Sequence, residues 1–222
     1  MKIFISRKLK ANSSFFTKLP KEDFEIIDES LLSFSAVAIK KIPSSNWVFF
    51  YSKNAVKFSL ENASLKKEML QRKIAVMGTG TARVLSKYNL KADFVGAGSI
   101  DEIAMNFSKL VTQQTVLFPQ AKKSRQSIQK KLPNTIKSIS LVVYENNIKS
   151  NFEIPEVDYL IFTSPLNAKA YYQKYPINKN QKVLAIGPTT ARALQKIGVE
   201  KISIAKEPSE KALVAILKNQ AS

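Results

Sequence analysis

Apolar and polar residues alternate in blocks along the chain, and the clearest block covers residues 182–205. Its apolar run at 183–186 is typical of a strand buried on both faces of a parallel sheet. A Gly-Pro pair ends this run, and Thr189 or Thr190 is expected to cap a helix that stops at Gly198. Such a strand–turn–helix unit directs free backbone N–H groups beyond the carboxyl end of the strand, where they bind anions.

The same pattern occurs earlier, over residues 73–90. Both segments contain Gly-x-x-Thr-Ala-Arg, and Asn89 stands where the later segment has its helix-ending glycine. A second pair of strands, 47–52 and 159–164, also matches in position. The chain is therefore predicted to contain two similar halves, each with two anion-binding strand ends.

The remaining blocks alternate strands with helices, which predicts an α/β fold of two doubly wound, flavodoxin-like parallel-sheet domains joined by a two-stranded linker. Five strands precede the polar stretch 146–155 when counted from Trp47, and only three follow it. One domain is therefore expected to combine residues 1–33 with 148–222, and the other to occupy 40–142. The linker crossings are expected near 32–39 and 141–147, and the alternative is one continuous mixed sheet.

Two local expectations follow from the same pattern. The strand that begins at Thr115 is expected to break at Pro119, since proline cannot donate a ladder hydrogen bond. A helix is expected over residues 122–132, beginning with the basic group Lys122, Lys123 and Arg125.

Composition narrows the chemistry. The 222 residues include neither histidine nor cysteine, which excludes a Ser-His-Asp triad, a cysteine nucleophile and the usual zinc ligands. No tight Asp/Glu cluster suggests a magnesium site. The absence of a signal peptide, of a membrane-length apolar run and of cysteine predicts a cytoplasmic protein.

The formal net charge of +18 indicates an anionic partner or a set of solvated lysine faces. Because the lysines are spread over the whole length, a small polyanion fits the charge as well as nucleic acid does. A nucleic-acid binder remains an alternative, which predicts an affinity that falls steeply with salt.

Taken in order, a set of short motifs resembles the uroporphyrinogen-III synthase family, whose members close the tetrapyrrole ring on the way to haem. The resemblance spans the chain through Ile5-Ser6-Arg7, Phe50-Tyr51-Ser52, residues 76–82, Leu117-Phe118-Pro119 with Arg125, Val143-Tyr144, residues 162–165 and residues 186–191. Lys8, Tyr51 and Lys53 depart from the family's more usual Pro, Thr and Pro.

The resemblance implies a monomer with its active site in a cleft between two domains. It implies a cofactor-free reaction, without a metal, in which hydroxymethylbilane loses its terminal hydroxyl and closes through a spiro intermediate with inversion of ring D. It also implies a hand-over of substrate from hydroxymethylbilane synthase, with no nucleic-acid or membrane partner. A non-catalytic two-domain α/β module that binds an anionic metabolite or nucleotide is the alternative.

The candidate site residues each have a simpler structural explanation. Tyr144 is an ordinary strand aromatic unless, as the resemblance implies, it lies at the cleft and donates a proton to the departing hydroxyl. The substrate-binding candidates are otherwise helix caps, first-turn residues or surface charges. They are Arg7, Ser52, Thr79, Thr81, Arg125, Ser164, Leu166, Thr189 and Thr190.

Overall fold

A computed structural model describes residues 1–221, and its contacts divide the chain into two compact units. Unit 1 consists of Met1–Ser33 with Asn147–Ser222, and unit 2 of Phe34–Asn146. Each unit has its own sheet, so the alternative of one continuous mixed sheet is wrong. The predicted α/β class with parallel sheets is confirmed.

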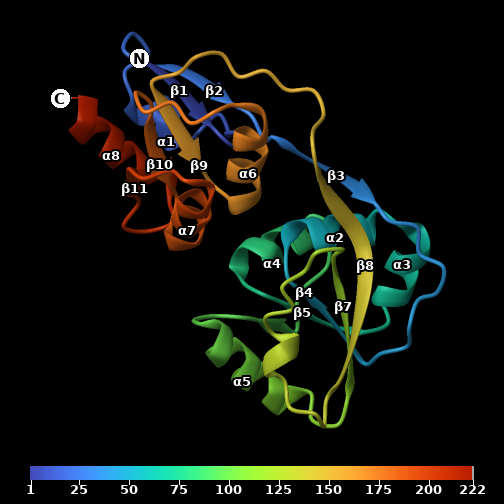
Figure 1. Cartoon of the computed structure of the whole chain (residues 1–222). Coiled ribbons are helices and arrows are strands. Elements are labelled where there is room, and N and C mark those ends of the chain that lie inside the picture. The colour runs from blue at the N-terminus through green and yellow to red at the C-terminus, as the bar shows by residue number, and fades with distance from the viewer. Residues whose placement is uncertain (222) are drawn as a thin grey trace. The chain divides into compact units, whose positions relative to one another are not determined.

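Unit 1 has five strands and four helices within the described residues (Figure 1). In chain order they are β1 (Lys2–Ile5), α1 (Ser14–Lys18), β2 (Glu25–Asp28), β9 (Tyr159–Phe162), α6 (Pro165–Lys174), β10 (Lys182–Ala185), α7 (Pro188–Ile197), β11 (Ile202–Ile204) and α8 (Glu210–Ala221).

Unit 2 contains the remaining elements, although β3 begins before its first residue and β8 ends after its last. They are β3 (Leu32–Ala36), β4 (Trp47–Phe50), α2 (Lys53–Leu60), α3 (Ala63–Met69), β5 (Lys73–Val76), α4 (Thr79–Ser86), β6 (Phe94–Val95), α5 (Ile100–Leu110), β7 (Thr115–Ala121), the 3-10 turn η1 (Gln129–Lys131) and β8 (Lys137–Ile148).

The two sheets have the same spatial order although the chain enters them at different points. Unit 1 runs β11-β10-β9-β1-β2, and unit 2 runs β6-β5-β4-β7-β8 with β3 added outside β8. The pairings within each five-stranded set are parallel. Strands β9 and β10 therefore correspond to β4 and β5, as the sequence repeat predicts.

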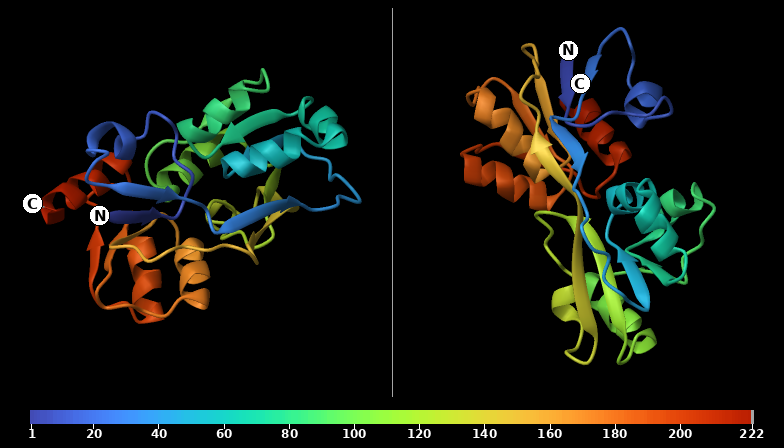
Figure 2. Two further views of the ribbon diagram at one scale, coloured as in Figure 1. Left: turned by 90° about the horizontal axis from the view of Figure 1, so that it is seen from above. Right: turned by 90° about the vertical axis from the view of Figure 1, so that its right-hand side faces the viewer.

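Helices cover both faces of each sheet (Figures 1 and 2), and apolar side chains pack between the helices and the sheet. In unit 1, α6 and α7 pack on one face through residues such as Tyr171 and Leu194. Helices α1 and α8 pack on the other through Phe15 and Leu213. Unit 2 is built likewise, with α2, α3 and α4 on one face and α5 with η1 on the other.

The chain passes between the units twice, along β3 and β8, which are neighbours in the sheet. The N–H of Val37 donates to the carbonyl of Val143, and that of Lys149 to Leu31. Residue numbers thus rise on one strand as they fall on the other, so these strands are antiparallel. Strand β8 continues to Ile148, so the first residues of the polar stretch 146–155 belong to this strand.

The expected break at Pro119 is wrong, because β7 continues to Ala121. The register of β7 with β4 ends at Leu117, whereas its pairing with β8 continues to the end of the strand. A proline is tolerated where one side of a strand needs no donor. The ladder with β8 is then irregular between Gln120 and Ala121.

Candidate active site at the carboxyl ends of the strands

In unit 1, β9 ends at a serine that caps the next helix. The Ser164 hydroxyl accepts a hydrogen bond from the N–H of Asn167 at 3.3 Å and from its Nδ2 at 2.9 Å. Asn167 is buried, and its Oδ1 accepts from the N–H of Leu31 at 2.8 Å. Leu166, on the first turn of α6, is 42% exposed. The start of α6 is thus held by the hydrogen bonds of Ser164 and Asn167 on the side that faces the core, while Leu166 leaves the other side exposed to solvent.

The four threonines at the Gly-x-x-Thr-Ala-Arg turns are not helix caps, which corrects the expectation for Thr189 and Thr190. The capping residues are Gly187 and Gly78, both extended, and neither helix has a side-chain cap. Helix α7 begins two residues earlier than a cap at Thr189 would allow, because Pro188 suits the first helical position.

The threonines instead lie within the first turns. Thr190 and Thr81 are buried, with 3% and 7% of their surface exposed, while Thr189 and Thr79 are exposed. Pro188 has no N–H, and those of Thr190 and Ala191 donate to the Gly187 carbonyl, so within the described residues the N–H of Thr189 is the first-turn donor of α7 left for an anion. At α4, Thr81 and Ala82 donate to Gly78 in the same way, which leaves the N–H groups of Thr79 and Gly80.

Arg7 follows β1 and is held by an acidic residue of α8. Its Nη2 donates to Glu210 Oε1 at 2.5 Å, and Glu210 Oε2 accepts from the Ser13 hydroxyl and the Ser14 N–H. The Arg7 Nε is buried and has no hydrogen-bond partner in residues 1–221. Arg7 is therefore fixed in direction rather than a mobile surface charge.

In unit 2, Tyr144 and Ser52 are in contact. The Ser52 hydroxyl accepts from the N–H of Ala55 at 3.1 Å, as the cap of α2, and lies 3.2 Å from the Tyr144 hydroxyl. The Tyr144 ring is 8% exposed and stacks on Phe58, with centroids 5.3 Å apart and planes 12° apart. Phe34 borders the same ring at 6.2 Å. The tyrosine hydroxyl is thus directed to the amino end of a helix.

The helix expected over residues 122–132 is absent, and Arg125 lies exposed in a loop. Gln126 has a left-handed φ of 53°, and its N–H donates to the Ser124 hydroxyl, which forms a turn instead of a helix. The loop is held at its far end by Tyr51, whose hydroxyl accepts from the N–H of Gln129 at 3.0 Å. Sequence reasoning identified Tyr51 only as a departure from the family pattern.

Burial raises the pKa of Tyr51 to about 12, against the smaller opposite effect of hydrogen bonds from Gln129 and Ile128. The phenol therefore stays neutral over the physiological range. Since its unfolded pKa is about 10, the folded protein loses stability as pH rises from about 10 to about 12.

We expect Tyr51→Phe to lower the free energy of unfolding by about 1 kcal/mol at pH 8, because the Gln129 N–H loses its acceptor. The difference should shrink between pH 10 and 12, since only the wild type then has to deprotonate a buried phenol. Denaturant unfolding of both proteins at several pH values measures it. A difference that stays constant with pH would contradict the burial of this hydroxyl.

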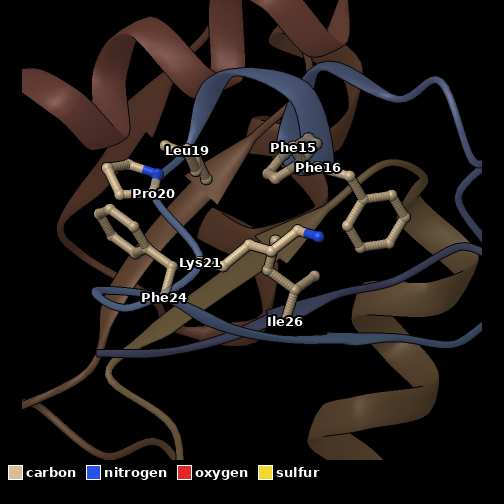
Figure 3. Close-up of a pocket in the computed structure, with 7 residues that line it drawn as sticks. All are labelled: Phe15, Phe16, Leu19, Pro20, Lys21, Phe24 and Ile26. Atoms are coloured by element: carbon tan, nitrogen blue, oxygen red, sulfur yellow. The ribbon is translucent and has the colours of Figure 1, made fainter.

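Two pockets of unit 1 are less suited to a polyanionic ligand. Figure 3 shows a pocket of about 150 Å³ between α1 and β2, lined by apolar side chains apart from Lys21. A pocket of about 640 Å³ beyond β2 contains Lys8 and Lys149, but these already pair with Asp28 and Glu29. The first pocket is thus mainly apolar, and the lysines of the second are already neutralised by neighbouring carboxylates.

The structure places the predicted site residues in two groups. Arg7, Ser164, Leu166, Thr189 and Thr190 follow the carboxyl ends of β1, β9 and β10, and Ser52, Thr79 and Thr81 follow β4 and β5. Tyr144 joins the second group through Ser52, and Arg125 lies in the loop after β7. Residues 1–221 contain no cluster of three or more acidic side chains arranged to hold a metal, and no helix among them is long and apolar enough to cross a bilayer.

The chain is similar to known proteins of one kind. A family model described as uroporphyrinogen-III synthase HemD matches residues 15–215. A Methanocaldococcus jannaschii protein with the provisional name uroporphyrinogen-III synthase is 28% identical, over 89% of this chain and 90% of its own. The uroporphyrinogen-III synthase of Chlorobaculum parvum is 27% identical, over 69% of this chain and 70% of its own.

Solved structures give the same result. The crystal structure of uroporphyrinogen-III synthetase from Helicobacter pylori 26695 superposes with a TM-score of 0.78 and 25% identity, covering 99% of this chain and all of the other. Because the family model matches almost the whole sequence and the fold agrees over its full length, the chain belongs to the uroporphyrinogen-III synthase family.

Proposed function

We propose that this protein converts hydroxymethylbilane into uroporphyrinogen III. The terminal hydroxyl leaves ring A as water, ring D is attacked at its substituted carbon to give a spiro intermediate, and ring D is then inverted as the macrocycle closes. The observation that carries the proposal is the family match over residues 15–215. In this proposal the protein acts as a monomer without a cofactor and receives its substrate from hydroxymethylbilane synthase.

The strand ends supply what this substrate needs for binding. Hydroxymethylbilane carries eight carboxylates, and the chain has a net charge of +18. We assign substrate carboxylates to the uncapped first turns of α7 and α4, to the open side of α6, and to Arg7 and Arg125. Uncatalysed closure gives isomer I, so holding a flexible chain in one geometry is the main task of the enzyme.

Tyr144 is assigned as the group that protonates the departing hydroxyl. A neutral phenol can donate a proton as the C–O bond breaks, and the chain has no histidine or cysteine for this step. The Ser52 hydroxyl lies 3.2 Å from the Tyr144 hydroxyl and orients the phenol through a hydrogen bond. The α2 amino end adds positive potential that stabilises negative charge on the tyrosine oxygen after transfer.

A coupled assay tests the proposed reaction. Hydroxymethylbilane synthase supplies the substrate, and the product isomers are separated after oxidation. We expect added protein to shift the product from isomer I to isomer III. Isomer I alone at saturating protein would exclude the synthase, and stabilisation by nucleotides but not by uroporphyrinogen would then favour a non-catalytic binding module.

Thr190→Val tests the anion site at α7. Valine matches threonine in shape and removes only the hydroxyl, and that hydroxyl is not a helix cap. We therefore expect the free energy of unfolding to change by less than about 1 kcal/mol, while uroporphyrinogen III binds several-fold more weakly. Calorimetry measures the binding. The control is Thr112→Val, which makes the same change at an exposed position just after α5. Equal losses of stability and binding would show that Thr190 has a structural role only.

A further inference from the structure

Each unit has one point where the order of its sheet reverses. In unit 2 this lies between β4 and β7, and in unit 1 between the corresponding strands β9 and β1. The chain leaves the two strands of such a pair toward opposite faces, and in doubly wound sheets ligands bind beyond the carboxyl ends of these two strands. Residues at the ends of β1 and β7 are therefore placed to contact a ligand.

The registers show which residues correspond at these two points. Trp47 matches Tyr159 in the repeat, and they pair with Val116 and Ile3 respectively. Val116 thus corresponds to Ile3, and four residues further along each chain segment Gln120 corresponds to Arg7. Neither the apolar pattern nor the family motifs single out Gln120.

Both matched residues hold an unsatisfied polar atom. Gln120 is 3% exposed, and its Oε1 is buried without a hydrogen-bond partner in residues 1–221. The Nε of Arg7 is likewise buried and unpartnered within the part of the chain that the structure describes. A buried amide oxygen without a donor destabilises a fold, and its retention at the carboxyl end of β7 is explained if a ligand supplies the donor.

The position of Gln120 permits such a contact. It is level with Tyr51 when the register of β7 with β4 is extended, and it lies on the face of the sheet that carries Phe118. Lys122 and Lys123, which follow directly, are exposed. The amide therefore lies at the carboxyl end of β7, where the core of unit 2 meets the loop that follows the strand.

We propose that Gln120 is a substrate-binding residue whose Oε1 accepts a hydrogen bond from a pyrrole N–H of the tetrapyrrole chain. The proposal rests on the proposed function. Ionised carboxylates have no proton to donate, so the pyrrole N–H groups are the donors that this substrate offers to an acceptor. In this proposal Arg7 binds a substrate carboxylate, and Gln120 binds the N–H of a pyrrole ring.

Gln120→Leu separates a ligand contact from a structural one. Leucine fills the space without an unsatisfied oxygen, so the melting temperature should rise by about 2–4 °C. The affinity for uroporphyrinogen III, measured anaerobically by calorimetry, should fall by about 3–10-fold, with a similar rise in KM for hydroxymethylbilane. A lower melting temperature, or an unchanged affinity and KM, would overturn the proposal.

Two controls sharpen the test. Gln114→Leu changes the same residue type at the other end of β7, where Gln114 accepts from the Trp47 indole N–H at 2.7 Å. It should lower the melting temperature and leave binding unchanged. Benzenehexacarboxylate, which has carboxylates but no N–H, should bind wild type and Gln120→Leu equally. An equal loss for both ligands would place Gln120 against a carboxylate and overturn the pyrrole contact. The wild type's own isomer III production reports on the proposed function independently.

Discussion

Replacing Tyr144 by phenylalanine is expected to lower the turnover number by about 10–100-fold, the low end of the contribution of one proton-transfer group. In the proposed reaction the hydroxyl that leaves ring A needs a proton as its bond to carbon breaks, and we assign this donation to the Tyr144 hydroxyl, which lies 3.2 Å from that of Ser52. Other acidic protons of the bound substrate can replace part of this donation, so some activity remains. The coupled assay at saturating hydroxymethylbilane measures the change.

The fold of the Tyr144→Phe variant should be retained, because the stacking on Phe58 involves only the ring. Ser52→Ala provides a matched comparison, since it removes the partner hydroxyl and also the cap of α2, which is worth about 1 kcal/mol. If Ser52 acts through Tyr144, the double variant should lose little more turnover than Tyr144→Phe alone. Wild-type turnover in folded Tyr144→Phe would leave positioning alone as the mechanism.

Much of the fold could be predicted because it is encoded locally and twice. The apolar runs 74–77 and 183–186 are each followed by a glycine and a Thr-Ala-Arg helix start, and the structure has a strand and a helix at both places. Gly198 and Asn89 adopt the positive φ expected of them, at 103° and 59°. The capping box that joins Ser99 to Glu102 at the start of α5 is equally local. These features depend on neighbouring residues only.

The predictions that failed depend on distant contacts. Pro119 looked like a strand end, but its effect is decided by how far β4 extends alongside β7. The basic stretch after residue 121 has helical composition, yet the N–H of Gln129 bonds to Tyr51, 78 residues away in the sequence, and this contact together with a local turn at Ser124 holds the stretch as a loop. Neither β4 beside β7 nor Tyr51 beside Gln129 can be identified from the local pattern.

The candidate site shows the same division. Ser52 and Ser164 could be predicted as caps, because a serine three residues before a helical N–H is a local signal. The pairing of Ser52 with Tyr144, across a sequence separation of 92, could not. The unsatisfied oxygen of Gln120 is visible only when every neighbour is placed, since it consists of the lack of a partner within the described residues.

The ion pair between Arg7 and Glu210 is expected to contribute strongly to stability. Glu210 accepts from Arg7, from the Ser13 hydroxyl and from the Ser14 N–H, and it therefore joins the segment after β1 to the start of α8. Both charged side chains of the pair are only about a third exposed, at 35% and 27%. Removing the carboxylate leaves a cation and two donors without their acceptor, a larger loss than that of an exposed salt bridge.

We expect Glu210→Ala to lower the free energy of unfolding by about 2–3 kcal/mol, or roughly 5–10 °C in melting temperature. Because Arg7 would no longer be held in one direction, KM for hydroxymethylbilane should rise while the turnover number changes little. Glu207→Ala is the matched control, since Glu207 accepts only from Ser209 at an exposed site and should change neither quantity. Glu210→Gln keeps an acceptor for Ser13 but loses the charge, so it should recover part of the stability. If Glu210→Ala lowered stability with an unchanged KM, the ion pair would support the fold without orienting Arg7 toward substrate.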